Sequence, residues 1–199
     1  MKIKMILFLI LTILFIFLIN LSNTDNQIYY VNIDTTKELK FNKNLSNNLK
    51  KQKKLEKYVN YFSKKDYRTT DLINDIEENI KINDQNIQNA LIKSDILTLY
   101  VGINDINYKI GNNNKEELYE YTDQVLDDIE KLLKIIRIYS KEKIYLIGYQ
   151  NNIGISYSEY FNYTNKRLKS ICEEYNVNFI NIDKKEDINK IILNKINVY

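Results

Sequence analysis

The sequence contains no histidine and a single cysteine, and both shortages exclude whole classes of chemistry. Without histidine, these residues cannot assemble a Ser-His-Asp or Cys-His catalytic group, because no other side chain exchanges protons as readily near neutral pH. A lone cysteine forms neither an intrachain disulfide nor a cysteine metal cluster. Cys172 lies in an apolar stretch with helical spacing, so we expect it in the hydrophobic core. No Walker pattern, glycine-rich phosphate loop or metal-ligand cluster occurs, so we expect neither a metal nor another cofactor.

Proline and tryptophan are also absent, and glycine occurs only four times, whereas Asn, Ile, Lys and Tyr are abundant. This skew is typical of an AT-rich coding sequence, so a missing glycine or proline says little about function. A missing histidine says more, because no other side chain replaces its chemistry.

Positive charge is in slight excess, with 29 Lys and Arg against 26 Asp and Glu spread along the chain. A nucleic-acid-binding domain normally needs a clustered basic face, so we expect no nucleic-acid partner. The one local concentration comprises Lys50, Lys51, Lys53, Lys54 and Lys57. We interpret it as the solvated face of a helix, in preference to a patch for anionic lipid.

Residues 1–26 have the pattern of a membrane anchor. Lys2 and Lys4 precede the apolar run Met5–Ile19, which a single threonine interrupts. A helix of that length spans about 22 Å, against a hydrocarbon core of about 30 Å, so the run is a short anchor or the apolar part of a signal peptide. No small-residue cleavage site follows, which favours an uncleaved anchor over secretion after cleavage. The basic flank predicts that residues 27–199 lie on the extracytoplasmic side of the membrane.

The remainder, 27–199, has the pattern of one α/β domain in which strands alternate with helices. The clearest strands are continuous apolar runs, and the clearest helix, 116–139, carries apolar residues every three to four positions. The predicted strands are 27–33, 58–62, 95–101, 143–148 and 177–182, and the predicted helices are 69–77, 86–93, 116–139, 156–176 and 186–196. Residues 37–57 are polar, with leucines at loosely helical intervals. The alternation predicts a parallel sheet with helices on both faces, a three-layer α/β/α sandwich.

The strand 95–101 ends in Gly102-Ile103-Asn104-Asp105, where a functional loop is expected, because parallel α/β sheets bind ligands beyond the carboxyl ends of their strands. Glycine permits a sharp turn, and the asparagine amide can donate hydrogen bonds into a cleft. This strand and G-x-N-D, followed by a long amphipathic helix and the strand Lys143–Tyr149, resemble the third block of the SGNH (GDSL-type) hydrolases. Residues Tyr67–Leu72 also resemble the segment after that family's second block. The resemblance implies a flavodoxin-like fold, a sheet of about five strands, and activity of the esterase or lipase type.

Within the third block, the resemblance implies a role for individual positions. Asn104 matches the asparagine that stabilises the oxyanion in the family. Gly102 and Asp105 are its neighbours in the block and are candidate binding residues.

The other blocks depart from the family pattern. The G-D-S-L block falls at Ile33–Thr36, so Thr35 stands at the nucleophile position, with Asp34 beside it as a candidate binding residue. Asp66 corresponds most nearly to the block-two glycine, and the C-terminal D-x-x-H has no counterpart. A hydroxyl needs an adjacent base to attack an ester, and a carboxylate near the oxyanion opposes the developing charge. The resemblance therefore implies a pseudoenzyme.

Three functions remain open at this stage. The first is a membrane-anchored SGNH-like domain that is catalytically impaired or inactive and binds surface glycans or acyl esters. The second is a working ester hydrolase with an atypical base, for which Asp34, Asp183 and Asp187 are candidates, acting on Thr35 or on a water molecule.

The third function is that of an anchored surface interaction protein. Tyr157, Tyr160 and Tyr163 recur at three-residue intervals, and such a stripe either packs within the domain or contacts a partner.

Overall fold

The computed structural model of the chain describes residues 12, 27–36, 41–110, 115–151, 154–182 and 188–196. Within these residues, five parallel strands form one sheet in the order β2-β1-β5-β6-β7. The strands are β1 (Ile28–Asp34), β2 (Leu55–Val59), β5 (Ile96–Tyr100), β6 (Lys143–Ile147) and β7 (Asn178–Ile180). The predicted fold class, an α/β sandwich with a five-stranded parallel sheet, is confirmed.

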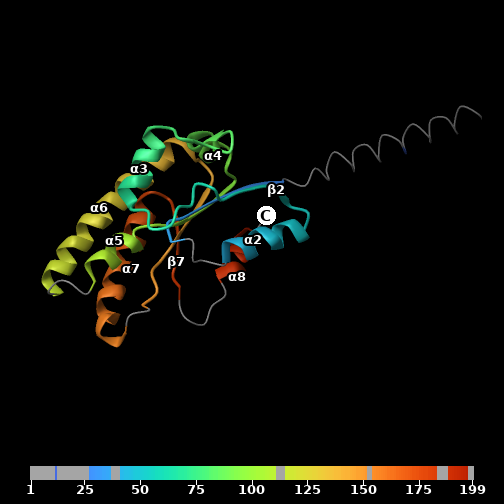
Figure 1. Cartoon of the computed structure of the whole chain (residues 1–199). Helices are drawn as coiled ribbons and strands as arrows, with labels where there is room; N and C mark the ends of the chain where they lie inside the picture. Colours follow the sequence, from blue (N-terminus) through green and yellow to red (C-terminus); the bar gives the residue numbers. More distant parts are fainter. Residues whose placement is uncertain are drawn as a thin grey trace, which may run out of the picture.

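Helices cover both faces of the sheet (Figure 1). One face carries α2 (Phe41–Lys51) and α8 (Ile188–Ile196), which contact each other. The other face carries α3 (Thr69–Glu77), α4 (Ile87–Lys93), α5 (Ile103–Lys109), α6 (Lys115–Tyr139) and α7 (Ser158–Glu174). A short 3-10 helix, η1 (Ile155–Tyr157), precedes α7. Right-handed crossovers explain this arrangement. The connection from β1 to β2 moves toward one edge of the sheet and the later connections move toward the other edge, so their helices lie on opposite faces.

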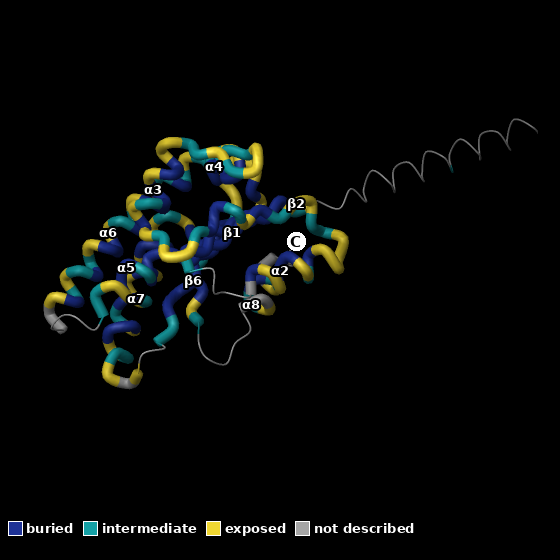
Figure 2. Tube along the Cα trace, in the orientation of Figure 1, coloured by how far each residue is buried: buried dark blue, intermediate teal, exposed yellow. Residues whose placement is uncertain are grey.

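The central strands are buried on both faces, as their continuous apolar sequences predict. Every residue of β5 is buried, and so are the last four residues of β6. Figure 2 shows this buried centre under helices whose outward faces are exposed. Cys172 belongs to the same core, and burial raises the pKa of its thiol to about 12, so the thiol is unreactive at neutral pH.

Sequence patterns misplaced or missed the smaller elements. Strand β2 covers Leu55–Val59 and not 58–62, because it is an edge strand whose exposed polar residues hide the apolar signal. The hairpin of β3 (Lys81–Ile82) and β4 (Gln85–Asn86) turns at Asn83 and Asp84, both with positive φ. Helix α5 was likewise not predicted as a separate element.

The predicted anchor, residues 1–26, lies outside the described residues apart from Thr12, and so do Asp183 and Asp187. None of the helices within the described ranges combines the length and the hydrophobicity that a membrane crossing requires.

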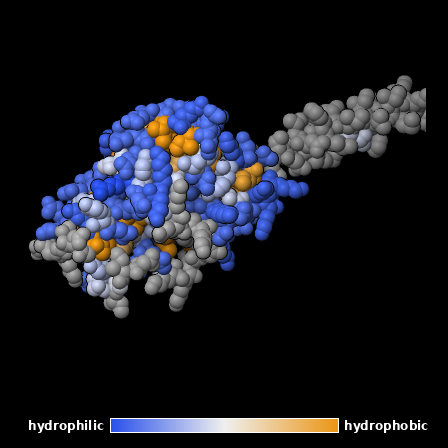
Figure 3. All heavy atoms as spheres, in the orientation of Figure 1, coloured by the Kyte–Doolittle hydropathy of each residue, from blue (hydrophilic) through white to orange (hydrophobic). Residues whose placement is uncertain are grey.

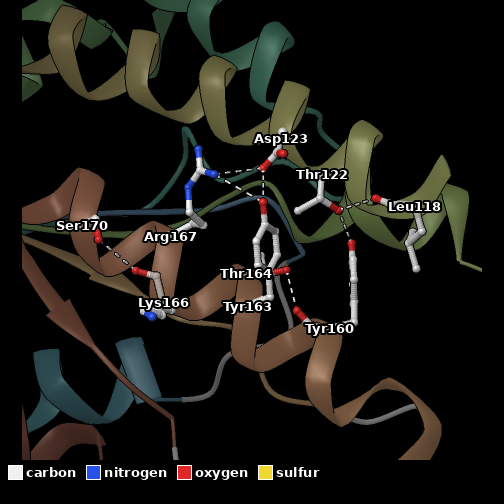
Figure 4. A network of polar contacts seen from close by, with 9 residues as sticks. All are labelled: Leu118, Thr122, Asp123, Tyr160, Tyr163, Thr164, Lys166, Arg167 and Ser170. Carbon is white, nitrogen blue, oxygen red and sulfur yellow. Dashed lines mark hydrogen bonds and ion pairs between the residues drawn. The ribbon is translucent and has the colours of Figure 1, made fainter. Parts of the chain in front are cut away.

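Two tyrosines of the predicted stripe, Tyr160 and Tyr163, lie on α7 and pack against α6 (Figure 4). Tyr160 is buried and its hydroxyl shares a hydrogen bond with Thr122. The Tyr163 hydroxyl donates to Asp123 Oδ1 at 2.6 Å, and Arg167 lies 3.5 Å from the same oxygen. These two tyrosines therefore serve an interface between two helices of the domain itself.

Candidate binding site at the carboxyl edge of the sheet

The site lies where the sheet changes winding direction. The chain leaves β1 toward α2 on one face and leaves β5 toward α5 and α6 on the other (Figure 1). Crevices of this kind, beyond the carboxyl ends of two adjacent parallel strands, are the usual ligand sites of open α/β sheets. Because β1 and β5 pair up to Asp34 and Tyr100, the segments after them begin side by side.

Gly102 forms the turn that follows β5. Its φ is +86°, in the left-handed region that favours glycine. A Cβ atom here would lie 2.6 Å from Ile129 Cδ1 and would also collide with the Tyr149 hydroxyl. That hydroxyl donates to the Val101 carbonyl at 2.6 Å, which fixes the strand end against the core. The turn delivers Asn104 into the first turn of α5.

Asn104 ties together three segments that are distant in the sequence. Its Nδ2 donates to the Thr35 carbonyl at 2.8 Å and to the Tyr67 carbonyl at 2.9 Å. An asparagine amide has two N–H hydrogens, so both are engaged by backbone. The amide therefore acts as a clamp between the segments after β1, β2 and β5.

Thr35 lies beneath this clamp and is fully buried. Its N–H donates to the Tyr100 carbonyl at 3.0 Å, and its hydroxyl donates to the same oxygen at 3.2 Å. The hydroxyl at the proposed nucleophile position thus points into the sheet. The next residue, Thr36, lines the pocket described below, and its hydroxyl and N–H donate to Asp34 Oδ1 at 2.8 and 2.9 Å.

Asp105 supports the site from below. It is 5% exposed, and its Oδ2 accepts hydrogen bonds from the Thr69 N–H and hydroxyl, both at 3.0 Å. Burial raises the pKa of this carboxyl, although the Thr69 hydrogen bonds and the charge of Arg68 act in the opposite direction. Asp105 thereby joins α5 to the beginning of α3.

Above these contacts lies a pocket of about 450 Å³. Residues from the same three segments line it: Thr36, Lys65, Asp66, Arg68, Asn104, Asn107 and Tyr108. The Tyr108 side chain is 63% exposed, and the Arg68 guanidinium carbon lies 4.7 Å from the centre of its ring. The pocket therefore combines an accessible aromatic ring with cations and amide groups.

Asp66 occupies the place that the family resemblance gives to a glycine. Its φ is +60°, the left-handed conformation for which glycine is the usual residue. Aspartate tolerates this region better than most side chains. Position 66 therefore places a carboxylate at the pocket wall in a left-handed backbone conformation.

Of the five residues proposed from the sequence, Asn104 lines the pocket, and Asp34, Thr35, Gly102 and Asp105 lie under or beside it. Sequence reasoning did not assign Thr36, Lys65, Arg68, Asn107 or Tyr108 to the site. A usable signal existed on α5, because residues 104, 107 and 108 have the spacing of one helix face.

Solved structures with the same architecture were found at low sequence identity. Axe2, an acetylxylan esterase from Geobacillus stearothermophilus, has a TM-score of 0.56 at 16% identity, over 82% of this chain and 78% of its own. A lipase from a goat rumen metagenome gives 0.61 at 14% identity, over 76% and 79%. An acetyl xylan esterase, AlAXEase, gives 0.55 at 12% identity, over 84% of both chains.

The fold is SGNH-hydrolase-like. No protein-family model and no curated protein sequence matches the chain. The likeness to these esterases and this lipase is one of fold alone.

Proposed function

We propose that this chain is an SGNH-like domain, held at a membrane by residues 1–26 on the extracytoplasmic side, that binds a surface glycan without efficient hydrolysis. The observation that carries the proposal is the use of the Asn104 amide as a backbone clamp.

Ester hydrolysis needs donors directed at the position where the oxyanion develops. Both Asn104 N–H groups are directed at the carbonyls of Thr35 and Tyr67. The Thr35 hydroxyl donates to the Tyr100 carbonyl and is fully buried. At the pocket wall, the Asp66 carboxylate would repel a developing negative charge. Asn104 and Thr35 therefore stabilise the fold around the pocket, and neither directs a hydrogen-bond donor at the position of an oxyanion.

A glycan suits the groups that do face the pocket. Exposed aromatic rings beside polar groups are typical of surfaces that combine apolar contact with hydrogen bonding, and Tyr108 offers such a ring. Asn107 and Lys65 add donors for hydroxyl and acyl oxygens. Because two of the solved structures with this fold are acetylxylan esterases, acetylated xylo-oligosaccharides are the first ligands to test.

The test is calorimetric titration of the full chain with acetylated and deacetylated xylo-oligosaccharides. We expect Tyr108→Ala to weaken binding about tenfold, the size of effect seen when a contact residue is truncated, and Tyr108→Phe to retain it. Ile138→Ala, at another exposed apolar residue, is the matched control. Equal binding by wild type and Tyr108→Ala would count against the proposal.

A second candidate, a slow ester hydrolase, is favoured by the contact between Thr36 and Asp34. The Thr36 hydroxyl lines the pocket and donates to a carboxylate at 2.8 Å, the arrangement of a nucleophile and a base. A carboxylate is a weaker general base than histidine, so only slow turnover is expected. Thr36→Val preserves the shape and removes the hydroxyl. Acetate release that survives this change would exclude Thr36 as the nucleophile.

A further inference from the structure

The opposite end of the molecule carries a concentration of positive charge that the pocket does not use. Three turns lead into β2, β5 and β6, and we call residues 50–54, 92–95 and 140–143 together the basic end. These ranges contain seven lysines and, as acidic residues, only Asp95 and Glu142. The lysines are Lys50, Lys51, Lys53, Lys54, Lys93, Lys141 and Lys143.

Hydrogen bonds hold these turns together around the start of β1. The Ile28 N–H donates to the Lys54 carbonyl at 2.6 Å, and the Tyr29 N–H donates to Asp95 Oδ2 at 2.7 Å. Ser94 and Ser140 share a hydrogen bond of 3.1 Å between their hydroxyls. The lysines of turns that are distant in sequence therefore belong to one continuous surface.

Aliphatic side chains are exposed at the same end. Ile92, near the end of α4, is 58% exposed, and Ile138, near the end of α6, is 63% exposed. Figure 3 shows a largely hydrophilic face on which apolar residues form small separate patches, one of them beside α4. The carboxylates of Glu173 and Glu174 lie at the end of α7, on the β7 side, so the excess of positive charge is greatest toward β1 and β2.

Lys53, one of these lysines, has an unusual backbone conformation, with φ in the left-handed region. Three of the described helices end in the same turn, with the second residue after the helix at positive φ and paired backbone hydrogen bonds. Asn79 and Asn176, both at φ 52°, occupy this position after α3 and α7, whereas Lys53 occupies it after α2 at φ 57°. Asparagine is the better residue in this conformation, so Lys53→Asn removes the charge and keeps the turn.

The predicted anchor, residues 1–26, precedes the part of the domain that carries the basic end. Strand β1 begins here, and residues 20–27 join it to the apolar run Met5–Ile19. Even fully extended, that connection spans at most about 29 Å. If residues 1–26 enter a membrane, the basic end is the part of the domain held closest to it, and the pocket lies at the far ends of the strands.

We infer that the basic end docks on an anionic lipid surface. The lysines contact the lipid headgroups, and Ile92 and Ile138 enter the interface between headgroups and acyl chains. This orientation, which rests on the proposed anchoring, turns the pocket away from the membrane.

The test uses the full chain reconstituted in vesicles of phosphatidylcholine alone and of equimolar phosphatidylcholine and phosphatidylglycerol. A fluorophore is attached at Gln52→Cys in the basic end or at Ser156→Cys beyond the carboxyl end of β6, both exposed, while Cys172 stays buried. Nitroxide-bearing lipids quench a fluorophore only near the bilayer. We expect quenching at position 52 in the anionic vesicles, weak quenching in the neutral ones, and little at position 156 in either.

Removing charge sharpens the test. Lys50→Gln, Lys51→Gln and Lys53→Asn combined are expected to weaken docking about a hundredfold, because each lysine near an anionic surface favours binding about fivefold. The control combines Lys109→Gln, Lys131→Gln and Lys166→Gln, which changes net charge equally elsewhere and leaves docking unchanged. Raised salt weakens docking through screening.

Two further outcomes separate docking from anchoring. Flotation of the chain with neutral vesicles depends on the anchor alone. Flotation with anionic vesicles but not with neutral ones would overturn the proposed anchoring by residues 1–26 and would still support docking of the basic end. Equal quenching at position 52 in both lipids, or equal loss of quenching in both triple variants, would overturn the docking surface.

Discussion

Replacing Asn104 by alanine separates a structural clamp from an oxyanion donor. The change removes two hydrogen bonds, to the Thr35 and Tyr67 carbonyls, at 2.8 and 2.9 Å. At about 1 kcal/mol each, their loss lowers the free energy of unfolding by about 2 kcal/mol. For a chain of this size, that corresponds to a fall in Tm of about 4–8 °C. Thermal unfolding followed by circular dichroism measures it directly.

The matched variant is Asn104→Asp, which keeps the shape but presents a carboxylate to two carbonyl oxygens. We expect it to lose at least as much stability as alanine, because it replaces two attractive contacts by repulsive ones. An oxyanion donor behaves differently, since its removal costs about 10²–10³ in kcat. An alanine variant with unchanged Tm and a large loss of ester turnover would refute the clamp.

Other changes test the support beneath the pocket. Gly102→Ala should cost about 2–4 kcal/mol in unfolding free energy, since it adds left-handed strain and a collision with Ile129; a cost near zero in denaturant titrations would contradict the turn. Asp66→Gly should leave stability within about 0.5 kcal/mol of wild type, whereas Asp66→Val should lose about 1–2 kcal/mol, because only the latter strains a positive φ; equal effects would show that this conformation is wrong. Burial raises the pKa of Asp105, so the native state binds its proton more tightly than the unfolded state, and this carboxyl costs stability above that pKa. Asp105→Asn should therefore be at least as stable as the wild type at pH 7, and the difference in unfolding free energy should shrink toward pH 4. A stability advantage of the variant that grows as the pH falls would contradict the raised pKa.

The layers of the fold could be predicted because they depend on strong local patterns. Strands β5 and β6 are continuous apolar runs, and the buried residues of α6 recur with helical spacing. The prediction displaces edge strand β2 because two of its five residues, Glu56 and Lys57, face solvent and carry charge. Helix α5 is too short for periodicity to separate it from the turn before it.

Sequence reasoning places the candidate site at the carboxyl end of β5, where the pocket lies, but it assigns the groups there differently from their geometry. Sequence matching places Thr35 at the nucleophile position, but strand alternation turns its hydroxyl toward Tyr100 and leaves Thr36 at the pocket. The segment after β2 could not be assigned to the pocket from sequence, because its approach to α5 depends on hydrogen bonds such as that from Asn104 to Tyr67.

The most direct test of the central claim is to incubate the full chain with an acetylated xylo-oligosaccharide that it binds, and to follow acetate by NMR. Binding with every acetyl group retained is the predicted result. Acetate release in proportion to protein concentration, abolished by Asn104→Ala in protein that remains folded, would contradict it.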